Sequence, residues 1–572
     1  MDSVVYEMSS SSESAPSIFL RKDFVSIMDN NNSSYASNYV TLDTSALSNS
    51  NKYMNYRESY LSIPLLITAT ATVADPVWGT AATSADMAFG LKNNYASVIH
   101  SIQVDLQGST VIQQTPFINL WNNFRLLTTL SWQDVATIGP SIGFYPDTST
   151  SYQFNTLAAP GAAGIGTCNN NNFFVAPVVS GAFNPQDSWN RGLYERQRVN
   201  NFAPDALTGV GGTNAPSAFS VLTSTGNLTA LYKSYIFNKT AGSATANAFQ
   251  ICIMASVYLR HLHSFFDKMP LMKGIYMKIT LQINNATTQF TKAAALNMTA
   301  AVPSVVVPSG GINPLMIASN FTGNGGVSLV ATSVYNISVS VGNTALGGLH
   351  SAAGNTVQKG IFASSIVLNV PSYVFSPVYE SAYLSSPVKI IEYSDVYFYQ
   401  VLNIAAGGLI NQLITNGISG LKSCVVIPFY TSGTAGNATI SPLLSPFDCA
   451  GGGSTSPLAH LTNTNLQVSG QNVIYNNQKY CYESFLNNLN GQNAVNGNQI
   501  DGLGSSLISQ LDFENKYCYT YLNLERMLPI EKSVPKSVVL QGQNTCQLSC
   551  DYFVFLEYGC EVSLNALSGS RV

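Results

Sequence analysis

The chain has 572 residues, of which 9 % are charged and 46 % hydrophobic, and its formal net charge is -4. This length exceeds what one hydrophobic core usually serves, and the apolar content excludes intrinsic disorder. Cations are few and none occurs before Arg21, so the composition disfavours a basic arm that binds nucleic acid.

The N-terminal stretch, residues 1–45, is rich in Ser and Asn, and we interpret it as a polar arm. Its first 17 residues lack the cationic and then apolar order of a signal peptide, so we expect no secretion by that route. A weakly charged surface is poor for a free monomer, because surface charge keeps proteins apart in solution. It suits a subunit whose sides are covered by neighbours.

Strands dominate the rest of the chain, as short apolar or alternating runs between clusters of Gly, Pro and Asn. Helical periodicity is confined to residues 117–130, to 480–489 and, weakly, to 408–413. Many strands and few helices indicate an antiparallel sandwich or barrel. The clearest predicted strands are residues 60–68, 98–106, 249–258, 275–283, 365–370, 396–403, 424–430 and 552–557.

Two sequence motifs each occur twice, in the same order. Residues 102–112 resemble 466–474, each with a Gly in a predicted hairpin turn, and residues 269–282 resemble 528–541, each with a Pro-bearing turn before a strand. Each predicted hairpin also leads to a helix with aromatic residues. Because self-similarity at this long spacing does not fit a solenoid, we infer two copies of one sizeable domain.

The two copies differ in size, because the interval between the motifs is more than twice as long in the first. The extra residues fall largely at about 139–248, and a second insertion covers about 290–360. The second insertion includes a run without charged residues, yet repeated Pro and Gly there exclude a membrane-spanning helix. We expect long loops in both insertions, with short strands in the second.

Few residues of the chain are candidates for catalysis or for binding a metal. His261 and His263 would share one face of a strand and could bind a metal, although a solvent-facing or interface pair is the favoured interpretation. Cys546, Cys550 and Cys560 offer three thiols for zinc or a disulfide, with unusual spacing. We therefore expect reduced thiols, no catalytic, metal or cofactor-binding residues, and no cofactor.

A stripe of aromatic residues at 393–399 could stack on sugars or bases, but core and subunit contacts are the favoured role.

The chain resembles a known family, the double jelly-roll major capsid proteins of virophages and polinton-like viruses. The motifs that carry the resemblance are Val370–Tyr373, Ser376–Glu380, Ile391–Asp395, Leu413–Ile418, Asn465–Asn472 and Val534–Gly542.

The resemblance implies an all-β fold of two tandem eight-stranded antiparallel jelly rolls, with few short helices and long loops in the first roll. It places the first roll at residues 46–380 and the second at 381–572, with strand 365–377 closing the first and the second opening near Val388. Three chains are then expected to form a pseudo-hexagonal capsomer of an icosahedral shell around double-stranded DNA.

The partners implied are further copies of the chain, neighbouring capsomers, and penton and minor capsid proteins, within a virion assembled inside the host cell. The protein would not be an enzyme, and whether a membrane lies near is left open. The alternatives are a glycan-binding or adhesin-like β-sandwich, including a viral fibre, and a β-rich enzyme such as a glycosidase, for which no pair of carboxylates stands out.

Overall fold

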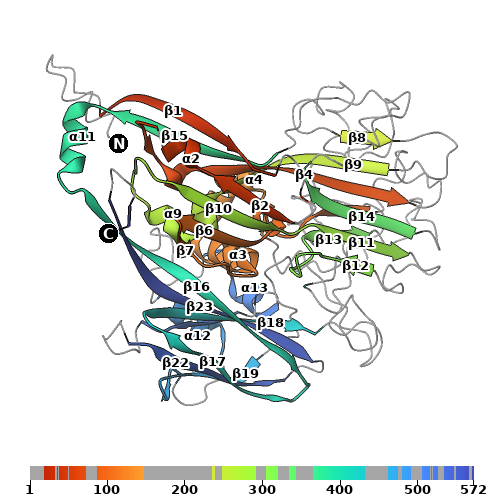
Figure 1. Cartoon of the computed structure of the whole chain (residues 1–572). Coiled ribbons are helices and arrows are strands. Elements are labelled where there is room, and N and C mark those ends of the chain that lie inside the picture. The colour runs from red at the N-terminus through yellow and green to blue at the C-terminus, as the bar shows by residue number, and fades with distance from the viewer. Residues whose placement is uncertain are drawn as a thin grey trace.

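The structure is a computed structural model dominated by antiparallel strands (Figure 1). Most of the predicted insertion at 139–248 and part of that at 290–360 lie outside the described residues. The described residues are 18–31, 35, 38–48, 50–71, 87–146, 235–238, 248–291, 304–319, 334–342, 365–431, 443, 461–474, 480–490, 506–515, 517, 519–525, 534–545, 549–565 and 570–571.

The framework of the first half of the chain consists of two sets of four hydrogen-bonded strands. One set belongs to a larger sheet and has the order β1 (Phe19–Met28), β15 (Val367–Phe375), β4 (Tyr60–Ala71), β9 (Ala248–Tyr258). The facing sheet has the order β2 (Tyr39–Asp43), β10 (Met277–Ile283), β6 (Ile99–Leu106), β7 (Ser109–Ile112).

The second half repeats this pattern. One sheet has the order β16 (Val388–Ile404), β23 (Cys550–Asn565), β18 (Leu421–Tyr430), β21 (Thr520–Asn523). Its partner has the order β17 (Leu409–Ile418), β22 (Lys536–Asn544), β19 (Leu461–Val468), β20 (Gln471–Asn472).

The connectivity of the two halves is identical. When the eight strands of each half are numbered along the chain, both halves have one sheet in the order 1-8-3-6 and one in the order 2-7-4-5. Two packed antiparallel sheets of eight strands with Greek-key connections define a jelly roll. The chain is a double jelly roll. We call the two halves roll 1 and roll 2.

Further elements decorate this framework, mostly in roll 1. β4 pairs with β15 through residues 60–62 and with β14 through residues 65–71, so its sheet extends past the roll. The additional strands are β3 (Tyr53–Met54), β5 (Met87–Leu91), β8 (Tyr235–Asn238), β11 (Ala286–Thr291), β12 (Ser304–Val306), β13 (Leu315–Ser319) and β14 (Val334–Val341). The helices are α2 (Ser45–Ser48), η1 (Tyr56–Glu58), η3 (Tyr95–Val98), α3 (Ile118–Thr129), α4 (Trp132–Ile142), α8 (Leu259–Leu262), α9 (Ser264–Lys268), α11 (Pro377–Leu384), α12 (Tyr482–Asn490) and α13 (Gln510–Asn515).

The repeated sequence motifs occupy equivalent strands. Ile102 on β6 pairs with Leu281 on β10, and Leu466 on β19 pairs with Leu540 on β22. All four side chains are fully buried. The motifs that recur along the chain are therefore neighbours in each roll, in the same register, which confirms the predicted duplication.

Roll 2 uses one sheet for two cores. On β18 and β23 successive side chains alternate between the interior of roll 2 and a larger core shared with roll 1: Val426 and Val554 face the first, Ile427 and Phe555 the second. A sheet buried on both faces needs apolar residues at every position, not every second one. This is why these two strands read as continuous apolar runs in the sequence.

All eight of the clearest predicted strands are present, and helices occur at 118–129 and 482–490 as expected. Helices α4 and α11 were not predicted, and two further predictions of secondary structure are wrong. The polar arm of residues 1–45 contains β1 and β2, because Val25 and Ile27 pack on the core although charged residues precede them. The weak helix at 408–413 is part of strand β17, whose Ile410 and Ile414 alternate into the interior of roll 2.

We propose that the boundary between the rolls lies near residue 380, in α11, since β15 ends at Phe375 and β16 begins at Val388. The expected short strands of the second insertion are β12, β13 and β14. In the described ranges no helix is long and apolar enough to cross a membrane.

The turns that follow β6 and β19 supply a test of the duplication. Gly108 and Gly470 both have φ near +80°, and each has open space where a Cβ would lie. We expect Gly108→Ala and Gly470→Ala each to lower the free energy of unfolding by about 1 kcal/mol, because L-residues disfavour this conformation. Chemical denaturation measures this cost.

Gly417→Ala is the matched control, since Gly417 also has open space around its Cβ position but no positive φ. It should be neutral or slightly stabilising, because alanine restricts the unfolded chain. If one of the two substitutions lowered the free energy of unfolding and the other had only the effect of the control, the two turns would not be equivalent.

Candidate functional site

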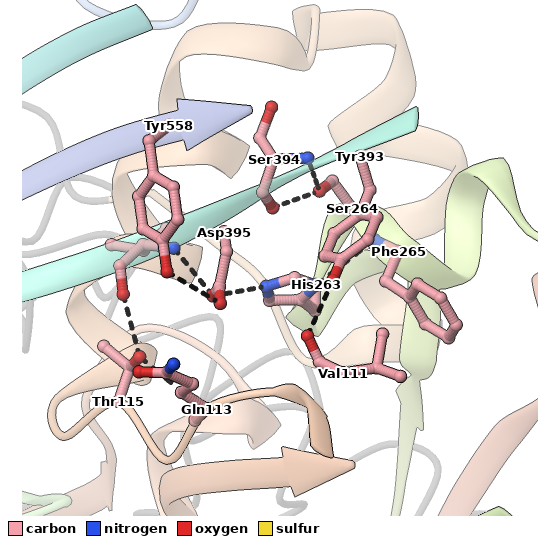
Figure 2. A network of polar contacts seen from close by, with 11 residues as sticks. Val111, Gln113, Thr115, His263, Ser264, Phe265, Tyr393, Ser394, Asp395 and Tyr558 are labelled. Atoms are coloured by element: carbon pink, nitrogen blue, oxygen red, sulfur yellow. Dashed lines mark hydrogen bonds and ion pairs between the residues drawn. The ribbon is translucent and has the colours of Figure 1, made fainter. Parts of the chain in front are cut away.

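A network of buried polar contacts joins the two rolls at their junction (Figure 2). Roll 1 contributes the end of β7 and the segment from α8 to α9, and roll 2 contributes β16 and β23. α9 lies directly against β16 in Figure 1. These contacts decide how one roll is held against the other.

His263 is the centre of the junction on the roll 1 side, and its side chain is 2 % exposed. Its Nδ1 accepts a hydrogen bond from the backbone N–H of Phe265 at 3.2 Å, which caps the start of α9. Its Nε2 lies 3.2 Å from Oδ1 of Asp395. Because Nδ1 accepts the Phe265 N–H, Nε2 is the nitrogen that donates to the carboxylate.

Asp395 on β16 is the matching centre on the roll 2 side. Its carboxylate accepts three hydrogen bonds: from the backbone N–H of Val396 at 2.8 Å, from the Tyr558 hydroxyl at 3.1 Å and from His263. Burial and the adjacent Asp395 charge raise the pKa of the Tyr558 hydroxyl, so it remains a donor. A buried carboxylate with three donors is tolerated where an unpaired one would not be.

Neutral contacts flank this pair. Ser264 donates its hydroxyl proton to the carbonyl of Ser394 at 2.6 Å and accepts the backbone N–H of Ser394 at 3.0 Å. The Tyr393 hydroxyl donates to the carbonyl of Val111 at 2.7 Å, and Thr115 donates to the carbonyl of Val396 at 2.9 Å. Backbone groups of β16 and of roll 1 are thus satisfied across the junction.

Aromatic packing surrounds the polar contacts. On α3 and at its start, Phe117, Trp121 and Phe124 turn toward roll 2. Phe117 lies 4.9 Å from the Phe553 ring, Trp121 lies 6.0 Å from Phe555, and Phe124 stacks on Tyr521 at 5.6 Å, measured between ring centroids. Aromatic pairs of this kind add about 1 kcal/mol each beyond the burial of their area.

Ser264, His263 and Asp395 superficially resemble a serine-hydrolase triad, but their geometry does not support one. A triad histidine accepts the proton of the serine hydroxyl with the nitrogen that does not face the carboxylate. Here that nitrogen accepts the Phe265 N–H, and the Ser264 hydroxyl is bonded to Ser394. The arrangement joins two domains and leaves no activated nucleophile.

The prediction for the two histidines was wrong in its local structure. Residues 259–268 are two short helices, because Leu259, Leu262, Phe265 and Phe266 recur at helical spacing and are all buried. His261 lies in α8, half-buried beside Tyr258, while His263 is buried at the junction. The two are therefore neither on one strand face nor both solvent-facing.

The cysteines and the aromatic stripe lie as follows. Cys550 and Cys560 lie at separate points of β23, about 33 Å apart at the rise of a strand, so they cannot share one metal ion. Cys546 lies outside the described residues. Burial and, to a smaller extent, the charge of Asp395 raise the pKa of Cys560 to about 11.

In the aromatic stripe, Tyr393, Phe398 and Tyr399 pack on the cores, and Tyr397 is 36 % exposed. The described part of the chain holds no cluster of three metal-binding side chains.

Sequence reasoning missed the role of Asp395 and Ser264. One signal was available: Asp395 stands directly before the run Val396–Tyr399, which is apolar and aromatic, in a chain that has few acids. A carboxylate in such a strand needs donors nearby, and that requirement predicts a partner from elsewhere in the fold.

No protein-family model and no curated protein matches this chain. Among solved structures, a chain of the Sputnik virophage, determined by cryo-electron microscopy, is 11 % identical with a TM-score of 0.47, over 98 % of this chain and 89 % of that chain. The mavirus major capsid protein is 9 % identical with a TM-score of 0.46, over 99 % and 92 %. The Faustovirus major capsid protein is 9 % identical with a TM-score of 0.38, over 98 % and 93 %.

The expected resemblance to virophage capsid proteins is confirmed. The similarity concerns the fold, which the strand order of the chain itself establishes.

Removing the His263 side chain tests the junction. We expect His263→Ala to lower the free energy of unfolding by about 2 to 4 kcal/mol, because Asp395 loses a donor in a buried site and α9 loses its cap. Arg57→Ala is the control, since its ion pair with Asp267 is exposed and should contribute less than about 1 kcal/mol. Equal effects of the two variants in denaturant titrations would contradict the role of His263.

Two other histidines near the junction predict acid sensitivity. Burial lowers the pKa of His100 to about 4, and burial, then the nearby charges of Arg260 and Arg125, lowers that of His261 to about 4. The unfolded chain binds protons at these groups below about pH 6.5, whereas the folded chain does not until about pH 4. Stability should therefore be fully present above pH 6.5 and fall as the pH drops toward 4.

The measurement is the free energy of unfolding against pH for the wild type and for His261→Gln. Loss of a titrating group should flatten the slope between pH 6.5 and 4 by up to one proton. An unchanged slope would show that His261 is not held neutral in the fold.

Proposed function

We propose that this chain is a viral major capsid protein, a structural subunit whose three copies form a pseudo-hexagonal capsomer. The observation that carries the proposal is the presence, in one chain, of two rolls with identical strand connectivity. Two such rolls per chain give six similar corners in a three-chain ring, which is the shape that packs a plane or a closed shell. The resemblance to virophage capsid proteins supports the same conclusion.

The junction fits this role. A capsomer can present six equivalent sides only if the two rolls keep one relative orientation, and buried polar contacts together with aromatic packing provide that constraint. The low charge of the chain, 9 % of residues, also permits dense lateral packing without the cost of desolvating many ions.

The remaining features of the proposal follow from this role. The capsomers would form an icosahedral shell with neighbouring capsomers and with penton and minor capsid proteins. Because the chain is mildly acidic, with 25 basic and 29 acidic residues, the shell would contain double-stranded DNA rather than bind it tightly. The protein would reside in the virion after assembly inside the host cell, and it would act without catalysis.

The mass of the purified protein in solution tests the proposal. Light scattering and native mass spectrometry should give three times the mass of one chain, and electron microscopy should show shells or sheets with hexagonal packing. A protein that stays a single chain at all accessible concentrations and binds glycans would instead support a glycan-binding β-sandwich, and the capsid proposal would fail.

A further inference from the structure

A polar pocket lies in roll 1 between β9, α3, α4 and α8, beside the junction but separate from its contacts with roll 2. It encloses about 210 Å³ of space that is partly open to solvent. Pockets for drug-sized ligands enclose about 300 to 1,000 Å³, so this one suits a small ion. Its polar lining consists of Asn94, Asn122, Ser256, Tyr258 and His261, and none of the described lining residues is acidic.

The two amide side chains of the pocket are arranged as hydrogen-bond donors. Oδ1 of Asn94 accepts the backbone N–H of Ala96 at 2.8 Å, and Nδ2 of Asn94 donates to Oδ1 of Asn122 at 3.2 Å. Nδ2 of Asn122 donates in turn to the carbonyl of His261. Each amide oxygen is therefore engaged, whereas each amide nitrogen keeps a second N–H that can donate to a ligand.

Two guanidinium groups stand beside this pocket. Arg260 precedes His261 on α8, and its guanidinium carbon lies 5.4 Å from the centroid of the Tyr258 ring. Arg125 follows Asn122 by three positions on α3, so the two side chains share one face of the helix. Burial and, to a smaller extent, the charges of Arg260 and Arg125 lower the pKa of His261 to about 4. Both cations thus act on a residue that lines the pocket.

These two cations lack a close counterion within the described part of the chain. Both are half-buried, neither takes part in an ion pair there, and Nε of Arg260 is buried without a hydrogen-bond partner. Burial lowers the pKa of Arg125, and the charges of Glu557 and Asp267 offset this only in part. Asp267 itself pairs with Arg57. Because a charge removed from water is costly unless it is paired, this arrangement favours an anion as its partner.

We propose that this pocket binds a small free oxyanion of the phosphate or sulfate class. Arg125 and Arg260 supply the positive charge, and guanidinium groups match the oxygens of such ions with paired N–H donors. The hydroxyls of Ser256 and Tyr258 and the remaining amide N–H groups supply further donors. The ion ties α3 to α8, and α3 is a helix by which roll 1 packs on roll 2. The proposal is independent of the capsid function.

Isothermal titration calorimetry of the full chain with inorganic phosphate, in a buffer without other oxyanions, tests this site. We expect saturable binding of one phosphate per chain. Arg260→Gln and Arg125→Gln should each bind at least tenfold more weakly, because each loses a charged hydrogen-bond donor. Arg21→Gln is the matched control, since Arg21 is an exposed arginine on β1 that pairs with Asp23, and it should bind phosphate as the wild type does.

Thermal unfolding gives a second readout. Phosphate should raise the Tm of the wild type by mass action, since it binds the folded chain. Phosphate also stabilises proteins through its exclusion from their surfaces, and its effect on the Tm of Arg260→Gln measures that background. The rise should therefore be larger in the wild type and in Arg21→Gln than in Arg260→Gln.

Three results would overturn the site: no saturable binding by the wild type, equal affinities in all three variants, or equal rises in Tm with phosphate. Displacement of phosphate by a short DNA duplex at stoichiometric concentration would also overturn it, because a duplex cannot enter the pocket and the affinity would then belong to an exposed cationic surface. None of these outcomes depends on whether the chain forms trimers, so the capsid proposal is tested separately.

Discussion

The structure depends on one sheet having two buried faces. β18 and β23 alternate their side chains between the interior of roll 2 and the core shared with roll 1, so neither core is complete without them. A roll that packed only on itself would expose Phe553 and Phe555 to water. The two rolls are therefore coupled by apolar burial, and the contacts of His263 and Asp395 add a specific orientation to an association that burial alone would leave less defined.

This constraint explains which parts of the fold could be predicted from sequence. Strands buried on one or both faces were identified, because alternation and continuous apolar runs both mark them, and the repeat of residues 102–112 and 466–474 reflects a shared pairing register. β1 was missed because its outward positions are a mixture of apolar and charged residues, so neither pattern is clean. The helix predicted near residue 410 failed because a short apolar run has no period of its own.

The junction was less predictable than the fold. His263 and Asp395 are 132 positions apart, and their pairing arises only when the segment from α8 to α9 meets the first strand of roll 2. No local pattern encodes such a contact. The sequence does show each partner as an anomaly, a histidine among large apolar residues and an acid in an aromatic strand, but it does not show that the two anomalies satisfy each other.

The division of pairing along β4 has a further consequence. Its first residues complete roll 1 beside β15, and its later residues belong to an extension built with β14 and β11. Two parts of one continuous strand therefore have different roles: the first residues of β4 complete roll 1, and the later residues determine how far the sheet extends beyond it. Insertions at the far end of that extension can therefore change the surface it presents, while the strand pairing of β1, β15 and the start of β4 in roll 1 is kept.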